Sequence, residues 1–340
     1  MRKMLNTLYV MTPEAYLHKD GLNVVMKVGE EERARIPIGN IEGIVCFTRA
    51  GISPGVMQLC VENGVTMSFL SPNGKFIGRI EGGVKGNVLL RTQQYRMADD
   101  KEKSLHVARL IVAGKIMNSC SVLRRYIRDY GKNERVEEAI GSLQYRKKDA
   151  LSAESIDELR GHEGDAAVSY FGVFDELILQ QKEYFRFDGR NRRPPRDAVN
   201  AMLSFTYTLL EHEVYSGLET VGLDPCVGFM HTLRPGRHSL ALDMMEELRA
   251  YLCDRFVLSL INRRQVSESD FQEQGEASIV MTEECRIRLI KAWQARKKET
   301  VEHPFLGEKI PIGLIPYSQA LLMARYVRGD LDDYPVFLMR

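Results

Sequence analysis

The sequence has no apolar run of the length, about 20 residues, that a membrane-spanning helix requires. Its six cysteines are scattered, with none within four residues of another, which excludes a zinc ribbon or a CxxC redox motif. Isolated thiols of this kind are typical of small buried hydrophobic residues. Residues 1–21 are partly basic, but their apolar stretch is short and interrupted by polar residues, unlike a signal peptide. We therefore expect a cytoplasmic protein.

Neither sign of charge predominates, because 47 basic and 46 acidic residues give a net charge of +1. A balanced total neither supports nor excludes a nucleic-acid partner, since the charges can still be segregated on the surface. With 44% hydrophobic and 27% charged residues, the chain has the composition of a globular protein and not of a collagen, a disordered chain or a coiled coil. Its 340 residues suffice for two domains of about 150 residues each.

Residues 1–98 are dominated by short apolar segments of strand length. Pro54–Asn63 predicts one helix, which Gly64 would end. The turn Ser71–Gly74 would join the last two strands as a hairpin. The predicted strands are Thr7–Met11, Leu22–Val28, Arg33–Ile38, Ile41–Cys46, Val65–Leu70 and Lys75–Ile80. This part is expected to be a small β-rich domain in which no constellation suggests catalysis.

Beyond residue 104 the apolar spacing becomes helical. Residues 99–104 lie in a polar, charged segment and are expected to be a linker. Helices are predicted over residues 105–131, from Ile156 onward, and at Asp197–Leu210, Leu240–Leu260 and Thr282–Lys298. The predicted fold class is therefore α+β, with a small N-terminal β-rich domain followed by a larger all-α domain over residues 105–340.

Glu163 heads an apolar stripe. The residues three, four, seven, eight and eleven positions later form one face of a helix, and they are Ala166, Ala167, Tyr170, Phe171 and Phe174. A lone carboxylate on this inward face would be strongly destabilising unless it were paired or bound to a cation. The pattern alone also fits a glutamate at a helix N-terminus, where the helix dipole favours negative charge.

His231 follows an apolar run and precedes a loop rich in Gly and Pro. An imidazole in this position is either a hydrogen-bonded core residue or a metal ligand, whereas His238 within the loop is expected to be exposed. Ser239 is the expected N-cap of the next helix.

That next helix has Asp243 and Glu246 three residues apart, hence on one face. Glu246 could instead pair with Arg249 on a solvated face. Together with Glu163 and His231, these carboxylates form a set of oxygen and imidazole donors, which suits Mg²⁺ or Mn²⁺ better than structural zinc. The ligands are far apart in the sequence, so only folding can bring them together.

Basic residues interleaved with aromatics lie between residues 185 and 196, a segment with five arginines and only one aspartate. The loop after His231 adds two more arginines. Arginine makes bidentate contacts to phosphates, which favours a polyanionic substrate; each cluster could also be solvated surface. The candidate DNA-binding residues are Arg186, Arg190, Arg192, Arg193, Arg196, Arg234 and Arg237.

Three motifs occur in order along the second half: LRGHEGDAAVSYF, RRPPRDAVNAMLSFTYTLL and GFMHTLRPGRHSLALDMMEELR. In this order and spacing they closely resemble the CRISPR-associated protein-one family, the DNA integrase that acquires new spacers. The resemblance extends over nearly the whole chain and includes the two-domain plan. The tail from His303 onward looks like the version that accompanies type I-C systems.

The resemblance also implies roles for residues. It places the metal-binding glutamate of the family on Glu163, its histidine on His231 and its third acidic ligand on Glu246, with Asp243 as a further candidate. Some members carry aspartate where this chain has Glu246, and either carboxylate can bind a metal. A polar line on one helix would border the active site together with Tyr170, although helix–helix hydrogen bonding would also explain it; this line is Asn200, Ser204 and Tyr207.

The implied activity is metal-dependent. With Mg²⁺ or Mn²⁺ bound, the 3′-hydroxyl of a short DNA duplex would attack a phosphodiester of the CRISPR repeat, and with water as the nucleophile the same site would cleave DNA. The implied partners are double-stranded DNA (protospacer and repeat), a second copy of the chain bound through the β-rich domain, and a small ferredoxin-like CRISPR-associated subunit that completes a heterohexamer. An iron–sulfur CRISPR-associated nuclease would join them in type I-C systems. No membrane partner is expected.

Two other functions remain open at this point. A metal-dependent nuclease that cuts branched DNA in repair would use the same ligands without joining strands. A non-catalytic DNA-binding scaffold would retain Glu163 and Glu246 as structural residues, and its DNA binding would not respond to chelators.

Overall fold

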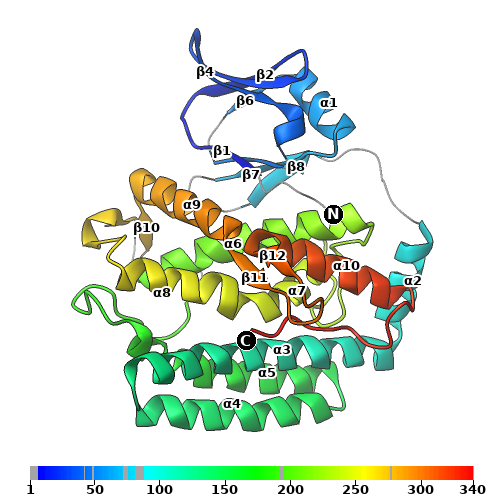
Figure 1. Ribbon diagram of the computed structural model, residues 1–340, viewed down its shortest axis with the longest axis vertical. Helices are drawn as coiled ribbons and strands as arrows, with labels where there is room; N and C mark the ends of the chain where they lie inside the picture. Colours follow the sequence, from blue (N-terminus) through cyan, green and yellow to red (C-terminus); the bar gives the residue numbers. More distant parts are fainter. Residues whose placement is uncertain are drawn as a thin grey trace. The chain divides into compact units, whose positions relative to one another are not determined.

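The computed structural model describes residues 7–41, 43–47, 50–71, 76–80, 88–191, 194–275 and 278–339. The chain divides into two compact units (Figure 1). The first comprises residues 1–85, 286–299 and 312–314, and the second comprises residues 86–285, 300–311 and 315–340. The predicted fold class is confirmed, since a β-rich region precedes a larger helical one.

Two four-stranded sheets dominate the N-terminal part of the first unit. One has the order β1-β5-β7-β8, built from Thr7–Val10, Gly43–Cys46, Thr66–Leu70 and Phe76–Ile80. The other has the order β4-β3-β2-β6, built from Glu31–Pro37, Asn23–Val28, Ala15–Asp20 and Gly51–Ile52. β7 and β8 pair antiparallel as the predicted hairpin requires; its turn residues 72–74 lie outside the described residues. β2 was not predicted, because its second half, His18–Asp20, is polar.

The helix α1 (Pro54–Glu62) is confirmed in its predicted place. Ser53 caps it by accepting a hydrogen bond from the Val56 amide at 3.3 Å, and Gly64 follows it with a φ of +67°, as a residue just past a helix end commonly has. The core of the unit joins side chains of both sheets and α1, including Leu17, Val24, Ile44, Leu59 and Met67.

The second unit is mostly helical, and α3, α4 and α5 lie side by side (Figure 1). Its helices are α2 (Val88–Asp99), α3 (Lys101–Tyr130), α4 (Glu134–Ser152), α5 (Ile156–Phe171), α6 (Ala198–Val221), α7 (Ser239–Arg249), α8 (Arg255–Asn262) and α10 (Ile315–Val327). A π-helical turn, Ala250–Asp254, connects α7 to α8 without a break. No helix in the described ranges is long and apolar enough to cross a bilayer.

The prediction that this region is all-α is too simple. Two short antiparallel pairs interrupt the helices, namely β9 (Phe271–Glu273) with β10 (Ile279–Met281), and β11 (Thr300–Glu302) with β12 (Lys309–Pro311). Helix α9 (Glu283–Lys298) has most of its residues in the first unit. Single 3₁₀ turns occur at Ile38–Asn40, Phe174–Leu177, Glu268–Asp270 and Ile312–Leu314.

The linker predicted at residues 99–104 is not a separate segment. The polar residues there form the end of α2 and the exposed first turn of α3. Asp100 caps α3 by accepting hydrogen bonds from the amides of Glu102 and Lys103, each at 3.1 Å. The contact boundary between the two units falls at residue 85 instead. A polar composition indicates solvent exposure. Because the first turn of a helix and a linker are both exposed, composition alone does not distinguish them.

Polar side chains cap two of the predicted helices. Ser155 accepts from the Glu158 amide at 3.2 Å, and Asp197, predicted as the first residue of its helix, is its N-cap and accepts from the Asn200 amide at 2.7 Å. Ser239 is wrong as an N-cap: His238 occupies that position, and the Ser239 hydroxyl instead donates to the Thr232 carbonyl at 3.3 Å in the preceding loop. The cysteines behave as predicted except Cys226, which is exposed whereas the other five are buried.

A C-terminal strap, Tyr334–Met339, ties α3 to α7. Asn118 of α3 donates to the carbonyls of Glu247 and Phe337 at 2.6 and 2.7 Å, and accepts from the Met339 amide at 2.7 Å. The Glu247 carboxylate of α7 accepts from the Phe337 amide at 2.6 Å and from the Tyr334 hydroxyl at 2.5 Å. These contacts fix the separation of two helices that also carry the candidate site.

Glu247 makes the stability of the fold depend on pH. Burial raises its pKa to about 7, although hydrogen bonds from Tyr334, Gln319 and Phe337 favour the ionised form. Its folded-state pKa lies above the unfolded value, so the stabilisation is complete below about pH 4.5 and is lost as the pH rises to about 7. We expect Glu247→Gln to flatten the fall in unfolding free energy over this window by about 3 kcal/mol. Urea unfolding from pH 5 to 8 measures it, and equal slopes in the two proteins would contradict the prediction.

Candidate active site

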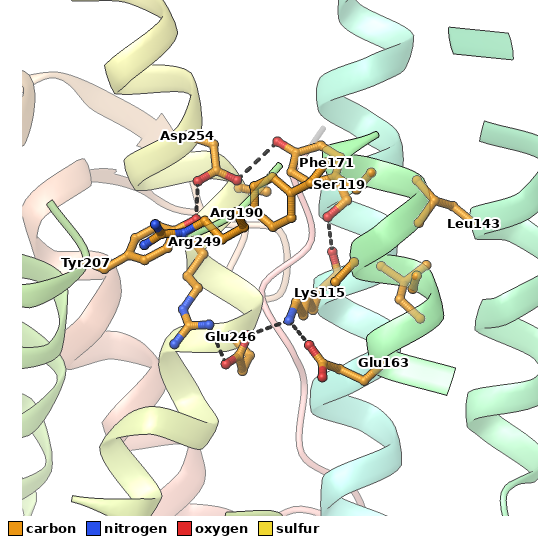
Figure 2. Close-up of a pocket in the computed structure, with 15 residues that line it drawn as sticks. Lys115, Ser119, Leu143, Glu163, Phe171, Arg190, Tyr207, Glu246, Arg249 and Asp254 are labelled. Atoms are coloured by element: carbon orange, nitrogen blue, oxygen red, sulfur yellow. Dashed lines mark hydrogen bonds and ion pairs between the residues drawn. The ribbon is translucent and has the colours of Figure 1, made fainter. Parts of the chain in front are cut away.

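Three helices of the second unit bring charged side chains to one point (Figure 2). The Lys115 ammonium of α3 forms ion pairs with Oε1 of Glu163 on α5 and, at 2.8 Å, with Oε2 of Glu246 on α7. The side chain of Glu246 is only 4% exposed and that of Glu163 is 24% exposed. Folding therefore brings together two of the carboxylates that the sequence identified 83 positions apart (246 − 163).

Local sequence explains this approach of the helices. Glu163 lies in the middle of α5 and not at its N-terminus, so the interpretation as a helix-dipole residue is wrong. Gly114 precedes Lys115, and a Cβ at Gly114 would lie 3.5 Å from Cβ of Glu247 and 3.1 Å from Cβ of Val336. The glycine therefore leaves room for α7 and the C-terminal strap against α3.

Glu246 also pairs with Arg249, as the alternative interpretation predicted, at 2.6 Å. That pair is buried, however, and does not lie on a solvated face. Burial alone would raise the pKa of Glu246, but the positive charges of Arg249 and Lys115 outweigh it and hold the pKa well below its usual range. The carboxylate is therefore ionised and available to a cation at neutral pH.

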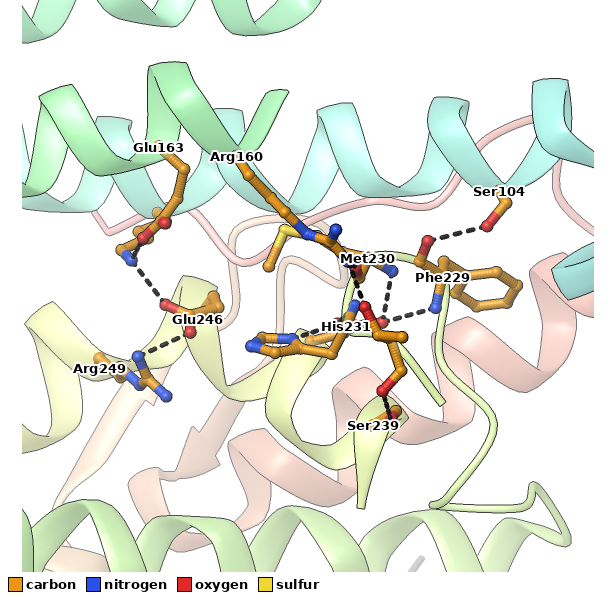
Figure 3. A network of polar contacts seen from close by, with 12 residues as sticks. Ser104, Arg160, Glu163, Phe229, Met230, His231, Ser239, Glu246 and Arg249 are labelled. Carbon is orange, nitrogen blue, oxygen red and sulfur yellow. Dashed lines mark hydrogen bonds and ion pairs between the residues drawn. The ribbon is translucent and has the colours of Figure 1, made fainter. Parts of the chain in front are cut away.

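His231 is held by Asp243 (Figure 3). Asp243 is fully buried; its Oδ1 accepts from the His231 amide at 2.9 Å and contacts the ring Nδ1 at 2.6 Å. Its Oδ2 accepts from the amides of Phe229 and Met230 at 2.6 and 3.0 Å. A carboxylate oxygen accepts this hydrogen bond, so Nδ1 is the donor, and in the neutral imidazole the lone pair then lies on Nε2. Figure 3 shows the ring directed toward Glu246, with no hydrogen bond to Nε2 from the described residues.

Gly228 allows this loop to lie against the start of α7. A Cβ at position 228 would lie 2.5 Å from Oδ2 of Asp243 and 2.8 Å from the Leu240 amide nitrogen. Side chains do not tolerate such distances, so glycine is required for the amides of the following residues to reach Asp243. The segment Gly228–His231 thus forms a backbone clamp, in which three consecutive amides hold the Asp243 carboxylate.

A cavity of about 180 Å³ adjoins these charged groups (Figure 2). Its lining includes Lys115, Glu163 and Glu246, together with small residues of α5, Ala166 and Ala167. These small side chains therefore leave open space beside the carboxylates.

Asp254 lies on the π-helical turn and lines the same cavity. It accepts hydrogen bonds from the hydroxyls of Tyr170 at 3.1 Å and Tyr207 at 2.7 Å. Burial raises the pKa of Asp254 to about 6, although both tyrosines favour its ionised form. The extra residue of a π-turn rotates the faces of the helix beyond it, and such turns are frequent at functional sites.

The predicted polar line on α6, which is Asn200, Ser204 and Tyr207, borders this cavity, and all three side chains contact Arg190. Arg190 donates to Oδ1 of Asn200 at 2.6 Å and to Oγ of Ser204 at 3.1 Å, and its Cζ lies 5.2 Å from the centre of the Tyr207 ring. Arg190 belongs to the loop before α6, whereas Tyr207 also hydrogen-bonds Asp254 on the π-helical turn between α7 and α8, so helix–helix hydrogen bonding is confirmed for Tyr207. The line thus presents a guanidinium to the cavity, while its role in catalysis stays a prediction.

The remaining predicted residues have different surroundings. Arg190 is partly buried and hydrogen-bonded to Asn200, and it lines the cavity, so its role in DNA binding stays a prediction. Arg186, Arg196 and Arg234 are exposed and Arg237 is partly buried, as DNA-binding side chains can be; Arg192 and Arg193 lie outside the described residues. His238 was expected to be exposed, but its Nδ1 contacts Oε1 of Glu211 at 2.9 Å and its side chain is 14% exposed.

In the described ranges, no group of three His, Cys, Asp or Glu side chains is arranged so that together they could hold a metal ion. The chemistry of the predicted donors nevertheless suits a divalent cation. Glu163 and Glu246 converge on the cation that is present, the Lys115 ammonium. Oε2 of Glu246 is buried and accepts no hydrogen bond of good geometry from the described residues. The third donor, Nε2 of His231, belongs to a carboxylate–histidine pair, the usual support of a metal-binding imidazole.

Sequence reasoning missed Lys115 and Asp254. Lys115 is the only charged residue between positions 110 and 123, within the apolar stripe of α3, and this isolation was a usable signal. Asp254 gave none, because a π-turn shifts the helical face in a way that regular periodicity does not reveal.

Comparison with known proteins identifies the family. Residues 8–295 match the family model described as CRISPR associated protein Cas1. The chain belongs to the Cas1 family. A CRISPR-associated endonuclease Cas1 of Chlorobaculum tepidum is 47% identical over the full length of both chains, and one of Rhodospirillum rubrum is 46% identical over 98% of each. A Cas4 exonuclease/Cas1 endonuclease fusion of Geobacter sulfurreducens is 36% identical over 98% of this chain and 60% of the fusion.

Solved structures share the Cas1 fold. A Cas1 protein from Thermotoga maritima matches 98% of this chain and 100% of its own with a TM-score of 0.84 at 24% identity. A casposase bound to an integration product matches 98% of this chain and 93% of its own, with a TM-score of 0.83 at 23% identity. A Cas6-RT-Cas1–Cas2 complex has a chain that matches all of this one over 37% of its own length, with a TM-score of 0.85 at 20% identity.

Proposed function

We propose that this Cas1 protein is a metal-dependent DNA integrase and endonuclease of CRISPR adaptation. The observation that carries the proposal is the convergence of Glu163 and Glu246 on a single cation, beside an imidazole whose Nε2 accepts no hydrogen bond from the described residues. The relatives named as CRISPR-associated endonucleases support DNA cleavage, and the casposase of similar fold supports strand joining.

Glu163, Glu246 and Nε2 of His231 would hold Mg²⁺ or Mn²⁺. A divalent cation bound there supplies Lewis acidity toward a phosphoryl oxygen and lowers the pKa of an attacking hydroxyl group or water. Asp243 is a poor candidate for the third ligand, because both of its oxygens already accept two hydrogen bonds each. We assign Asp243 to orienting His231 and fixing its tautomer.

The surrounding residues would bind and position DNA. Arg249 and Arg190 line the cavity and would offset the negative charge of a phosphodiester. The exposed Arg186, Arg196 and Arg234 would contact the backbone at a distance from the reaction. In joining, the 3′-hydroxyl of a short duplex forms a new phosphorus–oxygen bond in the repeat, the original bond breaks, and the departing 3′-oxygen takes a proton. Water in place of the hydroxyl gives cleavage.

The partners follow from the same assignment. The fold shared with a chain of a Cas1–Cas2 complex supports a small Cas2-type partner, and the Cas4–Cas1 fusion supports an exonuclease that trims incoming DNA. Pairing of two copies through the β-rich domain, a heterohexamer with the partner, and membership of a type I-C system stay predictions.

A plasmid assay tests the proposal. Supercoiled plasmid carrying a CRISPR repeat is incubated with a labelled short duplex and Mn²⁺ or Mg²⁺, with and without EDTA. We expect relaxed plasmid that carries the label covalently, and its complete loss with EDTA.

Two other outcomes select the alternatives. Cleavage of branched DNA without joining would indicate a repair nuclease. DNA binding that EDTA leaves unchanged, with neither joining nor cleavage, would indicate a scaffold.

A further inference from the structure

The candidate site already contains its own cation. Lys115 extends from α3 into the space between α5 and α7, and its ammonium contacts one oxygen of each carboxylate proposed to bind metal. Its side chain is 15% exposed, so these contacts are not a solvated surface pair. Burial works against the ammonium form, but the charges of Glu246 and Glu163 outweigh it and raise the pKa of Lys115 above its ordinary value.

The charges in this cluster balance without a metal. Lys115 and Arg249 provide two positive charges, and Glu163 and Glu246 provide two negative charges. A divalent cation added to these four groups would leave two excess positive charges in a poorly solvated space. It would also compete with the ammonium for Oε2 of Glu246, which Lys115 contacts at 2.8 Å. Arg249 contacts the other oxygen of Glu246, Oε1, and so does not obstruct Oε2.

We propose that Lys115 is a built-in counter-cation that holds Glu163 and Glu246 together in the metal-free protein and competes with the divalent metal for them. The inference rests on the proposed metal-dependent function. It follows that metal binding displaces the ammonium, and that Lys115 lowers the affinity for metal while it stabilises the unloaded site. Without it, the two ionised carboxylates would face each other, and Arg249 pairs with Oε1 of Glu246 alone.

Metal binding in the absence of DNA tests this competition. Lys115→Met retains the length and apolar stem of the side chain without its charge, and Lys101→Met removes one exposed positive charge at the start of the same helix. We expect the dissociation constant for Mn²⁺, measured by titration calorimetry, to be at least about tenfold lower in Lys115→Met than in the wild type. Lys101→Met should stay within about twofold of the wild type. Unchanged or weaker binding in Lys115→Met would overturn the proposal.

A second measurement uses the wild-type protein and so does not depend on how the variant folds. Amines are acylated with and without saturating Mn²⁺, and labelling is measured by mass spectrometry. We expect Mn²⁺ to increase labelling of Lys115 several-fold relative to Lys101, because the displaced ammonium loses two partners. Equal labelling in the presence and absence of Mn²⁺ would overturn the proposal.

The two proposals fail in different ways. If the wild type binds Mn²⁺ and Glu163→Gln does not, but Lys115→Met binds no more tightly and labelling is unchanged, the metal site stands and only the role of Lys115 is refuted. If neither the wild type nor Lys115→Met binds Mn²⁺, both the metal-dependent function and the competition are refuted.

Discussion

Glu163→Gln is expected to reduce strand joining and plasmid cleavage at least about a hundredfold while the affinity for duplex DNA changes by less than about twofold. The substitution keeps the size of the side chain but removes the negative charge that faces Lys115 and, in our proposal, the metal. Glu163 lies in a cavity rather than on an exposed basic surface, so DNA binding should persist. Joining of labelled duplex to plasmid and a gel-shift titration measure the two quantities.

Asp165→Asn is the matched control for this variant. It removes one carboxylate two residues later on α5, where the side chain is 56% exposed and pairs with Arg146 at 3.2 Å. The control should join and cleave DNA within about twofold of the wild type. Full activity of Glu163→Gln would refute the assignment of Glu163, and equal losses in both variants would point to a change in the helix.

Asp243→Asn is expected to have the largest effect on stability, a loss of roughly 3 kcal/mol in unfolding free energy, together with a severe loss of joining. The carboxylate is fully buried and receives three backbone amides and the His231 ring. The NH₂ group of an asparagine is itself a donor and would face two of these donors. Buried N–H groups would then lack an acceptor. The ring would also lose the partner that fixes its proton on Nδ1, so Nε2 would no longer be reliably available.

Urea unfolding and the joining assay measure these two effects. Asp157→Asn provides the comparison, since that carboxylate is 92% exposed and only pairs with Arg160 one turn away. It should change the unfolding free energy by less than about 0.5 kcal/mol. If Asp243→Asn is as stable as this comparison, the hydrogen bonds in the clamp do not contribute as we describe.

The sequence contained enough information for the starts of several helices, but α4 was not predicted and α6 extends to Val221, beyond the predicted end at Leu210. Capping side chains such as Ser155 and Asp197 act on residues three positions away, so their effect can be predicted locally. Glu163 was recognisable because a carboxylate interrupts an otherwise apolar face. Its convergence with Glu246, by contrast, depends on the packing of α3, α5 and α7, which no local pattern encodes.

The residues that were missed act at long range. Lys115 meets Glu163 across 48 positions and Tyr170 meets Asp254 across 84. Gly228 was visible in the sequence as a glycine within an apolar run, yet its function depends on Asp243 lying 2.5 Å from where its Cβ would be. Anion binding by Arg190 stays a prediction, and its internal support by Asn200 and Ser204 required the fold.

The C-terminal strap has a consequence for how the protein is handled and regulated. Asn118 follows Lys115 by three positions on α3, and Glu247 directly follows Glu246 on α7. The strap therefore hydrogen-bonds to both helices next to the residues of the candidate site. An affinity tag, a fusion or a binding protein that displaced Phe337 and Met339 would break these hydrogen bonds and loosen the packing of α3 against α7. The C-terminal strap is thus structurally coupled to the candidate site.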